Sequence, residues 1–245
     1  MRKVIHSYSN LYLKGSDKSI NFLSQALSAI CAKKVYGEIE FWGNKVVVDF
    51  LDETGISSLY DNIETIPDDF VGYYDIFASA GKFYSLLRQD KPVIHIDGDT
   101  FLFAPLEYDN CDIFFAHQDI HSDSLNTIAN IKSAYDCYVF PWKDFIQEEH
   151  DLNYFDLNDI YNMNVIGVEN IELANKVWQK VLDVYTSYKD RFHKGVPHWH
   201  IAEQFFTGYY CRKMNINTTS LYKMISQWVD DEGNFYFENT LHSGN

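Results

Sequence analysis

The chain has 245 residues, of which 46% are hydrophobic, and this is enough apolar material for the core of one large domain over residues 1–245. Its 20 basic and 35 acidic residues give a formal net charge of −15, which argues against nucleic acid and anionic lipid as partners because their phosphates repel such a chain. No run approaches the roughly 20 apolar residues of a membrane span, and the four cysteines are scattered. We therefore expect a cytoplasmic protein with free thiols and no integral membrane segment.

Two strand patterns near the start of the chain, residues 3–8 (KVIHSY) and 38–42 (EIEFW), enclose a helical one. The helix has a candidate N-cap at Ser16 or Asp17, and Gly37 stands where a C-cap glycine belongs. Its apolar residues recur at helical spacing: Ile20, Leu23, Leu27, Ile30 and Val35. The pattern predicts an amphipathic helix between two strands.

The rest of the chain continues this alternation after a stretch without a clear pattern. Gly43-Asn44 reads as a turn, and residues 45–70 favour no element. A helix over residues 75–88 then precedes the strand VIHI at residues 93–96, whose apolar residues suggest cover on both faces, as in a parallel sheet. The later predicted elements are strands at residues 111–119, 164–168 and in the tail 234–245, and helices at 171–192 and 199–213. Alternating strands and helices predict an α/β fold.

Two carboxylates follow the predicted strand at residues 93–96, in the stretch VIHIDGDTFLF. On an extended strand the Cα atoms of Asp97 and Asp99 would lie roughly 6.5 to 7 Å apart, too far for both side chains to grip one small cation easily. A sharp turn at Gly98 would bring them together, and carboxylate oxygens suit Mg²⁺ or Mn²⁺. The alternative is an ordinary turn, because Asp-Gly is common in turns. The apolar flanks leave little room for a surface loop, and burying two unpaired carboxylates is costly, so a bound cation is favoured.

The segment PVIHIDGDTFLFAPL resembles the DxD segment of GT-A fold glycosyltransferases of the glycogenin and lipopolysaccharide galactosyltransferase type. The resemblance implies a Rossmann-like mixed sheet flanked by helices. It also implies that Asp97 and Asp99 hold Mn²⁺ or Mg²⁺, and that the metal holds the diphosphate of a nucleotide-sugar donor. In such enzymes a helix precedes the DxD strand, and here Lys82 or Arg88 on that helix could face the donor; either could equally be a solvated surface residue.

Further segments follow the order of this enzyme family. YNMNVIGV, residues 161–168, resembles its Asn-x-Gly strand, so Asn162 would border the donor and acceptor sugars, while Asn164 replaces the usual glycine. The alternative is that both asparagines cap a strand end. HIAEQFFTGYY resembles the start of a helix that places Glu203 and Gln204 near the anomeric carbon, although they could instead lie on a polar helix face.

The two ends of the chain supply the remaining candidates. His242, in TLHSGN, resembles the late histidine that serves as a third metal ligand, but its spacing differs by one residue and a frayed tail is the alternative. The first strand would end beside the nucleotide base, which makes His6 and Tyr8 candidates for donor binding.

Two other functions compete with glycosyl transfer. His198, His200 and Glu203 could bind zinc, and the stretch HQDIH at residues 117–121 could add a second metal of a hydrolase. A non-catalytic protein that binds a nucleotide-sugar is the other alternative. The sequence favours a metal-dependent glycosyltransferase that moves a sugar, from a UDP-sugar by preference, to a glycan, lipid-linked or peptide acceptor.

Overall fold

The computed structural model describes residues 2–8, 18–67, 79–118, 161–188, 200–229 and 235–241. The strands are β1 (Lys3–Tyr8), β2 (Ile39–Gly43), β3 (Asn62–Thr65), β4 (Val93–Ile96), β5 (Ile113–Gln118), β6 (Tyr161–Val168), β7 (Thr218–Val229) and β8 (Phe235–Leu241). The helices are α1 (Lys18–Tyr36), α2 (Lys45–Thr54), the 3-10 helix η2 (Ile56–Leu59), α4 (Ala80–Leu87), α7 (Ile171–Tyr188), the π-helix η5 (His200–Phe205) and α8 (Phe206–Lys213).

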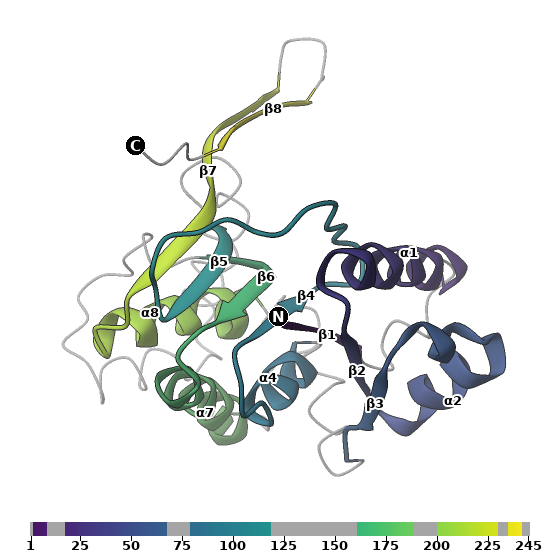
Figure 1. Ribbon diagram of the computed structural model, residues 1–245. Coiled ribbons are helices and arrows are strands. Elements are labelled where there is room, and N and C mark those ends of the chain that lie inside the picture. The colour runs from purple at the N-terminus through teal and green to yellow at the C-terminus, as the bar shows by residue number, and fades with distance from the viewer. Residues whose placement is uncertain are drawn as a thin grey trace.

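The described strands form one mixed sheet in the order β3-β2-β1-β4-β6-β5-β7-β8 (Figure 1). The four strands from β3 to β4 run parallel to one another. β6 is antiparallel to both β4 and β5, β7 is parallel to β5, and β8 is antiparallel to β7. The predicted α/β class, a mixed sheet flanked by helices, is confirmed. The prediction of one domain over residues 1–245 reaches beyond the described residues and stays a prediction.

Helices cover both faces of the sheet, and successive strand residues point to opposite faces. Ile5 and Phe115 belong to the core beneath α4, α7 and α8, whereas Val4 and Phe114 belong to the core beneath α1 and α2 (Figure 1). All four residues of β4 are buried, which confirms the expected cover on both of its faces. Among the described residues, no helix combines the length and the apolar character needed to cross a membrane.

The helix α1 forms where it was predicted, but the apolar stripe is not its buried face. Gly37 ends the helix with φ of 83° and donates its backbone N–H to the carbonyl of Lys33 at 2.8 Å, as the sequence predicted. Four residues of the stripe are 50–69% exposed: Ile20, Leu23, Leu27 and Ile30. The helix instead packs on the sheet through a mixed face of Phe22, Gln25, Ser28, Ala29, Ala32 and Tyr36, all of them buried.

Residues 43–67 contain two helices and a strand that the sequence did not predict. Gly43 ends β2, and the carbonyl of Asn44 accepts the backbone N–H groups of Val47 and Val48 at the start of α2. The proposed turn at Gly43-Asn44 is therefore a strand-to-helix junction. Gly55 ends α2 with φ of 74°, in the left-handed region that favours glycine.

The last third of the chain adds the part of the sheet that is farthest from β3. The helix predicted over residues 199–213 begins as the π-helix η5 and continues as α8. β7 follows it and was not predicted, whereas β8 confirms the strand expected in the tail. In Figure 1 the paired ends of β7 and β8 extend away from the helices.

Candidate functional site

The candidate site lies at the edge of the sheet where β1 and β4 end. After β1 the chain builds β2 and β3 on one side, and β4 then returns to pair with β1 on the other side. Open α/β sheets bind ligands beyond the carboxyl ends of their strands, at the point where the strand order reverses in this way. Tyr8 ends β1 and Asp97 directly follows β4, so both residues lie at this point.

Asp97 begins a tight turn. Its backbone N–H donates to the carbonyl of Asn164 on β6 at 2.9 Å, and its own carbonyl accepts the N–H of Thr100 at 3.0 Å. The central residues of the turn are Gly98 and Asp99, so the turn predicted between the two aspartates is confirmed. Gly98 does not adopt a positive φ. Its lack of a side chain matters for packing instead, because a Cβ there would lie 3.3 Å from the ring of Tyr8.

β6 brings its asparagines to the same edge because it runs antiparallel to β4. The Oδ1 of Asn162 accepts the backbone N–H of Asn164 at 3.0 Å, and Asn162 lies opposite His117 of β5 in the ladder. Asn164 has an ordinary strand conformation, so the asparagine in place of the family glycine needs no left-handed backbone. Asn164 thus contacts Asp97 through a backbone hydrogen bond, while Asn162 lies two residues away from it on β6.

Lys82 joins the DxD turn to the π-helix η5. The residue is 6% exposed on α4, and its Nζ lies 2.9 Å from Oδ1 of Asp97. The same ammonium donates to Oε1 of Glu203 and, at 3.0 Å, to the carbonyl of Met163 on β6. An ammonium group carries three N–H donors. Lys82 therefore uses its full donor capacity to hold together two carboxylates that are 106 residues apart in the chain.

The electrostatics of this cluster depend on how many charges share a buried space. The pKa of Asp97 is raised to about 6, because burial and the charges of Glu203 and Asp99 together outweigh the lowering effect of the Lys82 ammonium. Burial by itself lowers the pKa of Lys82, but Asp97 and Glu203 together raise it above its ordinary value. The Lys82 ammonium therefore stays protonated around neutral pH, and Asp97 is the group of the pair whose pKa lies closest to neutrality.

Contrary to the prediction from the sequence, the two aspartates are not both buried and unpaired. Asp97 is half-buried, with its side chain 32% exposed, and it has a partner, since Lys82 provides the positive charge. Asp99 is exposed. Two unpaired buried carboxylates, which were the reason to favour a metal over an ordinary turn, do not occur here. Among the described residues, no group of three or more His, Cys, Asp or Glu side chains could hold a metal ion.

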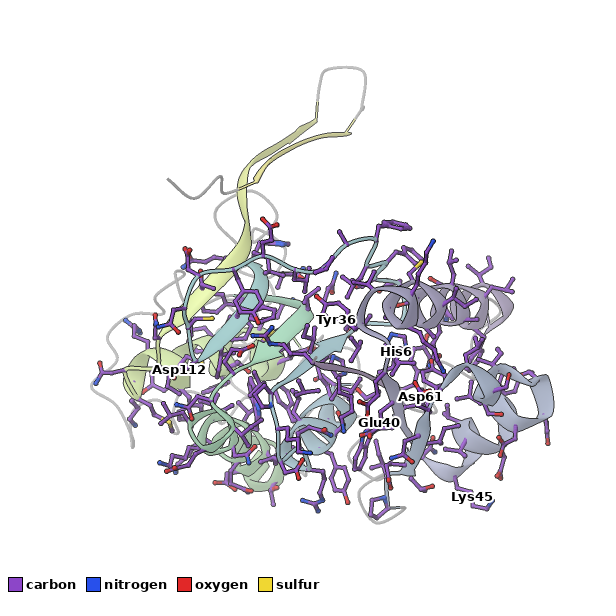
Figure 2. The ribbon with its side chains drawn as sticks, viewed as in Figure 1. His6, Tyr36, Glu40, Lys45, Asp61 and Asp112 are labelled. Carbon is purple, nitrogen blue, oxygen red and sulfur yellow. The ribbon has the colours of Figure 1, made fainter. Side chains whose placement is uncertain are left out.

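The two candidates on β1 differ in their surroundings. His6 is 1% exposed and points from β1 toward α1 (Figure 2). Its ring nitrogens contact Tyr60 and Ser28, and burial lowers its pKa to about 3. His6 therefore lies beneath the surface of the site. Tyr8 is half-buried, packs against Phe22 of α1 and lies beside Gly98, which keeps it at the edge of the sheet next to the DxD turn.

Arg88, the alternative to Lys82, lies outside the cluster. Its guanidinium stacks over the ring of Tyr84 at 4.5 Å from the centroid and donates to the Tyr84 hydroxyl at 3.3 Å. The residue is exposed at the end of α4. Of the two basic residues considered, Lys82 is the one that contacts the candidate site.

Comparison with known proteins places the chain in a family. A family model described as "Family of unknown function (DUF6734)" matches residues 15–243. The chain belongs to this family. No curated protein matches it.

Solved structures similar to this DUF6734 chain include glycosyltransferases at low identity. The glycosyltransferase GlyE of Streptococcus pneumoniae TIGR4 is 11% identical, with a TM-score of 0.45 over 90% of this chain and 45% of GlyE. Its apo form is 11% identical with a TM-score of 0.43, over 89% of this chain and 45% of GlyE. The apo form of mouse xyloside xylosyltransferase 1 is 10% identical, with a TM-score of 0.44 over 90% of this chain and 84% of that protein. The DUF6734 chain thus spans less than half the length of GlyE.

Several predicted site residues of this DUF6734 chain fall outside the described part of the structure. These are His242, His198, Asp119 and His121, and the side chain of His200 is also outside it. Glu203 is described, and its Oε1 accepts from Lys82. Gln204, beside it on η5, is half-buried. The metal role of His242 stays a prediction.

Sequence reasoning missed the polar residues beneath the DxD turn. Gln25, Ser28 and Tyr60 are buried there and contact His6 or one another. A signal was present for two of them, because Gln25 and Ser28 lie three residues apart on the face of α1 opposite the apolar stripe. They were missed because the apolar stripe was predicted to be the buried face of α1, whereas it is the exposed one. Tyr60 lay in the stretch without a pattern, and no local signal marked it.

Proposed function

We propose that this protein is a metal-dependent glycosyltransferase that takes a sugar from a nucleotide-diphosphate sugar, with a UDP-sugar favoured. The observation that carries the proposal is the position of Asp97, at the carboxyl end of β4 where the strand order reverses, in contact with Lys82 and through it with Glu203. Segments that resemble three separate parts of GT-A enzymes thus meet at one edge of the sheet. The acceptor would be a glycan, a lipid-linked glycan or a peptide.

The charge of the site supports a requirement for a divalent cation. Asp97, Asp99 and Glu203 outnumber the single ammonium of Lys82, so the cluster is net negative when all its groups are ionised. A diphosphate would be repelled by such a site unless a cation lay between them. Mg²⁺ and Mn²⁺ are commonly held by one or two carboxylates together with phosphate oxygens.

The residues present fit such an ion. Lys82 contacts Oδ1 of Asp97, and the Asp97 side chain is still 32% exposed. Asp99 is exposed beside it in the same turn. We propose that Asp97 and Asp99 hold the ion, with His242 as a candidate third ligand. When bound, the ion would supply Lewis-acid stabilisation of the charge on the leaving nucleoside diphosphate.

The remaining residues have positioning and binding roles in this proposal. Lys82 has no N–H left for a phosphate, so it would act by fixing Asp97 and Glu203 relative to each other. Glu203 and Gln204 would border the sugar, and Asn162 would border the acceptor side of the same edge. Tyr8 would contact the nucleotide base.

Binding of nucleotides tests the proposal directly. Thermal unfolding is measured with UDP, GDP, CMP and UDP-sugars, each with Mn²⁺, with Mg²⁺ and with EDTA. At a ligand concentration of 100 times Kd we expect about 2.7 kcal/mol of stabilisation, which for a chain of this size raises Tm by about 5 to 11 °C. The shift should appear with one nucleotide and disappear with EDTA.

Single variants connect that shift to the turn. Asp97→Asn and Asp99→Asn should abolish the metal-dependent shift and the turnover of the donor. The matched control is Asp90→Asn, because Asp90 is an exposed aspartate near the opposite end of β4. Nucleotide binding that persists unchanged in both turn variants, or a wild-type protein that binds no nucleotide with either metal, contradicts the proposal. A shift with Zn²⁺ alone would instead favour the hydrolase, and binding without turnover would favour the non-catalytic protein.

A further inference from the structure

A chain of buried polar side chains runs beneath the DxD turn. His6 on β1 is within 2.9 Å of the Tyr60 hydroxyl through Nδ1 and within 3.1 Å of the Ser28 hydroxyl through Nε2. The side-chain amide of Gln25 donates to Tyr60 at 3.0 Å. The Ser28 hydroxyl donates to the backbone carbonyl of Thr100. The chain therefore ends on the last residue of the turn that begins at Asp97.

The direction of every hydrogen bond in this chain follows from its last acceptor. A backbone carbonyl only accepts, so Ser28 must donate its single proton to Thr100. Ser28 is then an acceptor toward His6, and Nε2 of His6 must carry the imidazole proton. A neutral imidazole has one N–H, which makes Nδ1 the acceptor.

The other half of the chain agrees with this direction. With Nδ1 of His6 as an acceptor, the Tyr60 hydroxyl donates to it and its oxygen is left to accept from Gln25, which is the bond observed. The reverse direction would leave Ser28 and the carbonyl of Thr100 as two facing acceptors with no proton between them. One tautomer of His6 thus accounts for all four hydrogen bonds of the chain.

The turn is held from three sides, and the polar chain is one of them. Asp97 is tied to β6 through the carbonyl of Asn164, and Gly98 is packed closely against Gln25 and Tyr8. Ser28 fixes the far end by binding the carbonyl of Thr100. Among the hydrogen bonds shown for the described residues, this is the one that holds Thr100, the last residue of the turn, to α1.

We propose that His6 is a positioning residue for the turn that carries Asp97 and Asp99. As the Nε2–H tautomer it holds Ser28 in the orientation that donates to Thr100. The inference rests on the proposed function, because the order of this turn matters for donor binding only if the two aspartates take part in it. It also reassigns His6, which was expected to contact the donor.

The tautomer is tested without any ligand. The imidazole nitrogens of His6 are observed by ¹⁵N NMR at pH 7, with the signals assigned by their loss in His6→Gln. We expect a protonated Nε2 and an unprotonated Nδ1. A protonated Nδ1, or a ring with both nitrogens protonated, overturns the proposal.

The positioning role is tested by hydrogen exchange at the Thr100 amide, whose N–H closes the turn on Asp97. Ser28→Ala and His6→Leu should speed this exchange by about tenfold or more, because local opening becomes easier. His6→Gln should exchange more slowly than His6→Leu, since a glutamine can still accept from Tyr60 and donate to Ser28. Unchanged exchange in both Ser28→Ala and His6→Leu overturns the proposal.

A matched control separates positioning from a general loss of stability. Ser85 is also fully buried in a helix and donates to a backbone carbonyl, that of Lys82, at 2.8 Å. Ser85→Ala should leave the exchange at Thr100 unchanged after correction for global unfolding. Equal acceleration in Ser85→Ala would show that the effect is not specific to the polar chain.

Nucleotide affinity then links the turn to the proposed function. In the presence of Mn²⁺, Ser28→Ala and His6→Leu should weaken nucleotide binding by roughly 10- to 100-fold, the usual effect of removing a residue that orients a metal ligand. If the wild-type protein binds no nucleotide, the proposed function fails while the NMR and exchange results still decide the role of His6. If it binds and these variants bind equally well, the positioning role fails alone.

Discussion

Replacing Lys82 by methionine removes the only ammonium group that the described residues place between Asp97 and Glu203, at nearly constant side-chain length. Both carboxylates then remain at the site without that positive charge. Removal of one partner from a buried ion pair costs about 3 to 5 kcal/mol. The side chain of Asp97 is 32% exposed, so solvent screens part of its interaction with Lys82. We therefore expect a loss of about 3 kcal/mol at pH 8, at the lower end of that range.

The pH dependence of this loss distinguishes electrostatics from packing. In the wild-type protein the pKa of Asp97 is raised to about 6, above its unfolded value of roughly 3.9. The ionised carboxylate therefore costs stability above pH 6, and this cost declines as the pH falls through 6, because the folded chain takes up a proton before the unfolded chain does. Without Lys82 the pKa of Asp97 rises further. The difference in stability between wild type and variant should consequently be largest at pH 8 and shrink toward pH 5.

Urea unfolding at pH 8, 7, 6 and 5 measures this difference. A loss of about 3 kcal/mol corresponds to a fall in Tm of about 6 to 12 °C for a chain of this size. The control is Lys45→Met, since Lys45 makes an exposed ion pair with Asp49 one helical turn away and such pairs contribute about 0.3 to 0.5 kcal/mol. A loss below 1 kcal/mol for Lys82→Met, or one that does not change with pH, would contradict this prediction.

Two further predictions concern the framework around the site. Gly167→Ala should destabilise the protein by at least about 2 kcal/mol in urea unfolding, because a Cβ there would lie 1.8 Å from the ring of Phe114. Adding Phe114→Leu to the same chain should recover part of the loss. Wild-type stability of the single variant would contradict this prediction. Burial raises the pKa of Glu169, but hydrogen bonds from Arg2 and Tyr108 hold this pKa below its ordinary value. The ionised Glu169 carboxylate therefore stabilises the fold above its unfolded-state pKa, and this stabilisation is lost as the pH falls through its folded-state pKa. Glu169→Gln should cost about 1 kcal/mol at pH 7 and show a smaller loss of stability on acidification to pH 3 than wild type.

The sequence predicted most elements whose pattern is local. The strand VIHI was recognisable because four consecutive buried residues leave a continuous apolar run, and α1 ended at Gly37 because a left-handed C-cap favours glycine. The DxD turn followed from the residues themselves. The apolar stripe of α1 was misleading, since a period of 3.6 residues defines a face of a helix but not which way that face points. Here the sheet is covered by the mixed face, and the purely apolar one is exposed.

Other features depended on partners far away in the chain. The local sequence contains nothing that pairs Lys82 with Glu203, because 121 residues separate them and the contact exists only once α4 and η5 pack beside β6. The same packing supplies the carbonyl of Met163, which completes the coordination of the ammonium. From the sequence alone, Lys82 or Arg88 could face a donor or lie in solvent, whereas the tertiary structure commits Lys82 to two carboxylates.

The residue types and local spacings of this chain determined its α/β class, the turn between Asp97 and Asp99, and the order of the segments that resemble a glycosyltransferase. Only the tertiary structure decided which charges neutralise one another and which histidines are buried. The physical reason is that side-chain electrostatics and hydrogen bonding act over a few ångströms. Groups such as His6, Ser28 and Thr100 come within that distance only after the sheet and α1 have assembled.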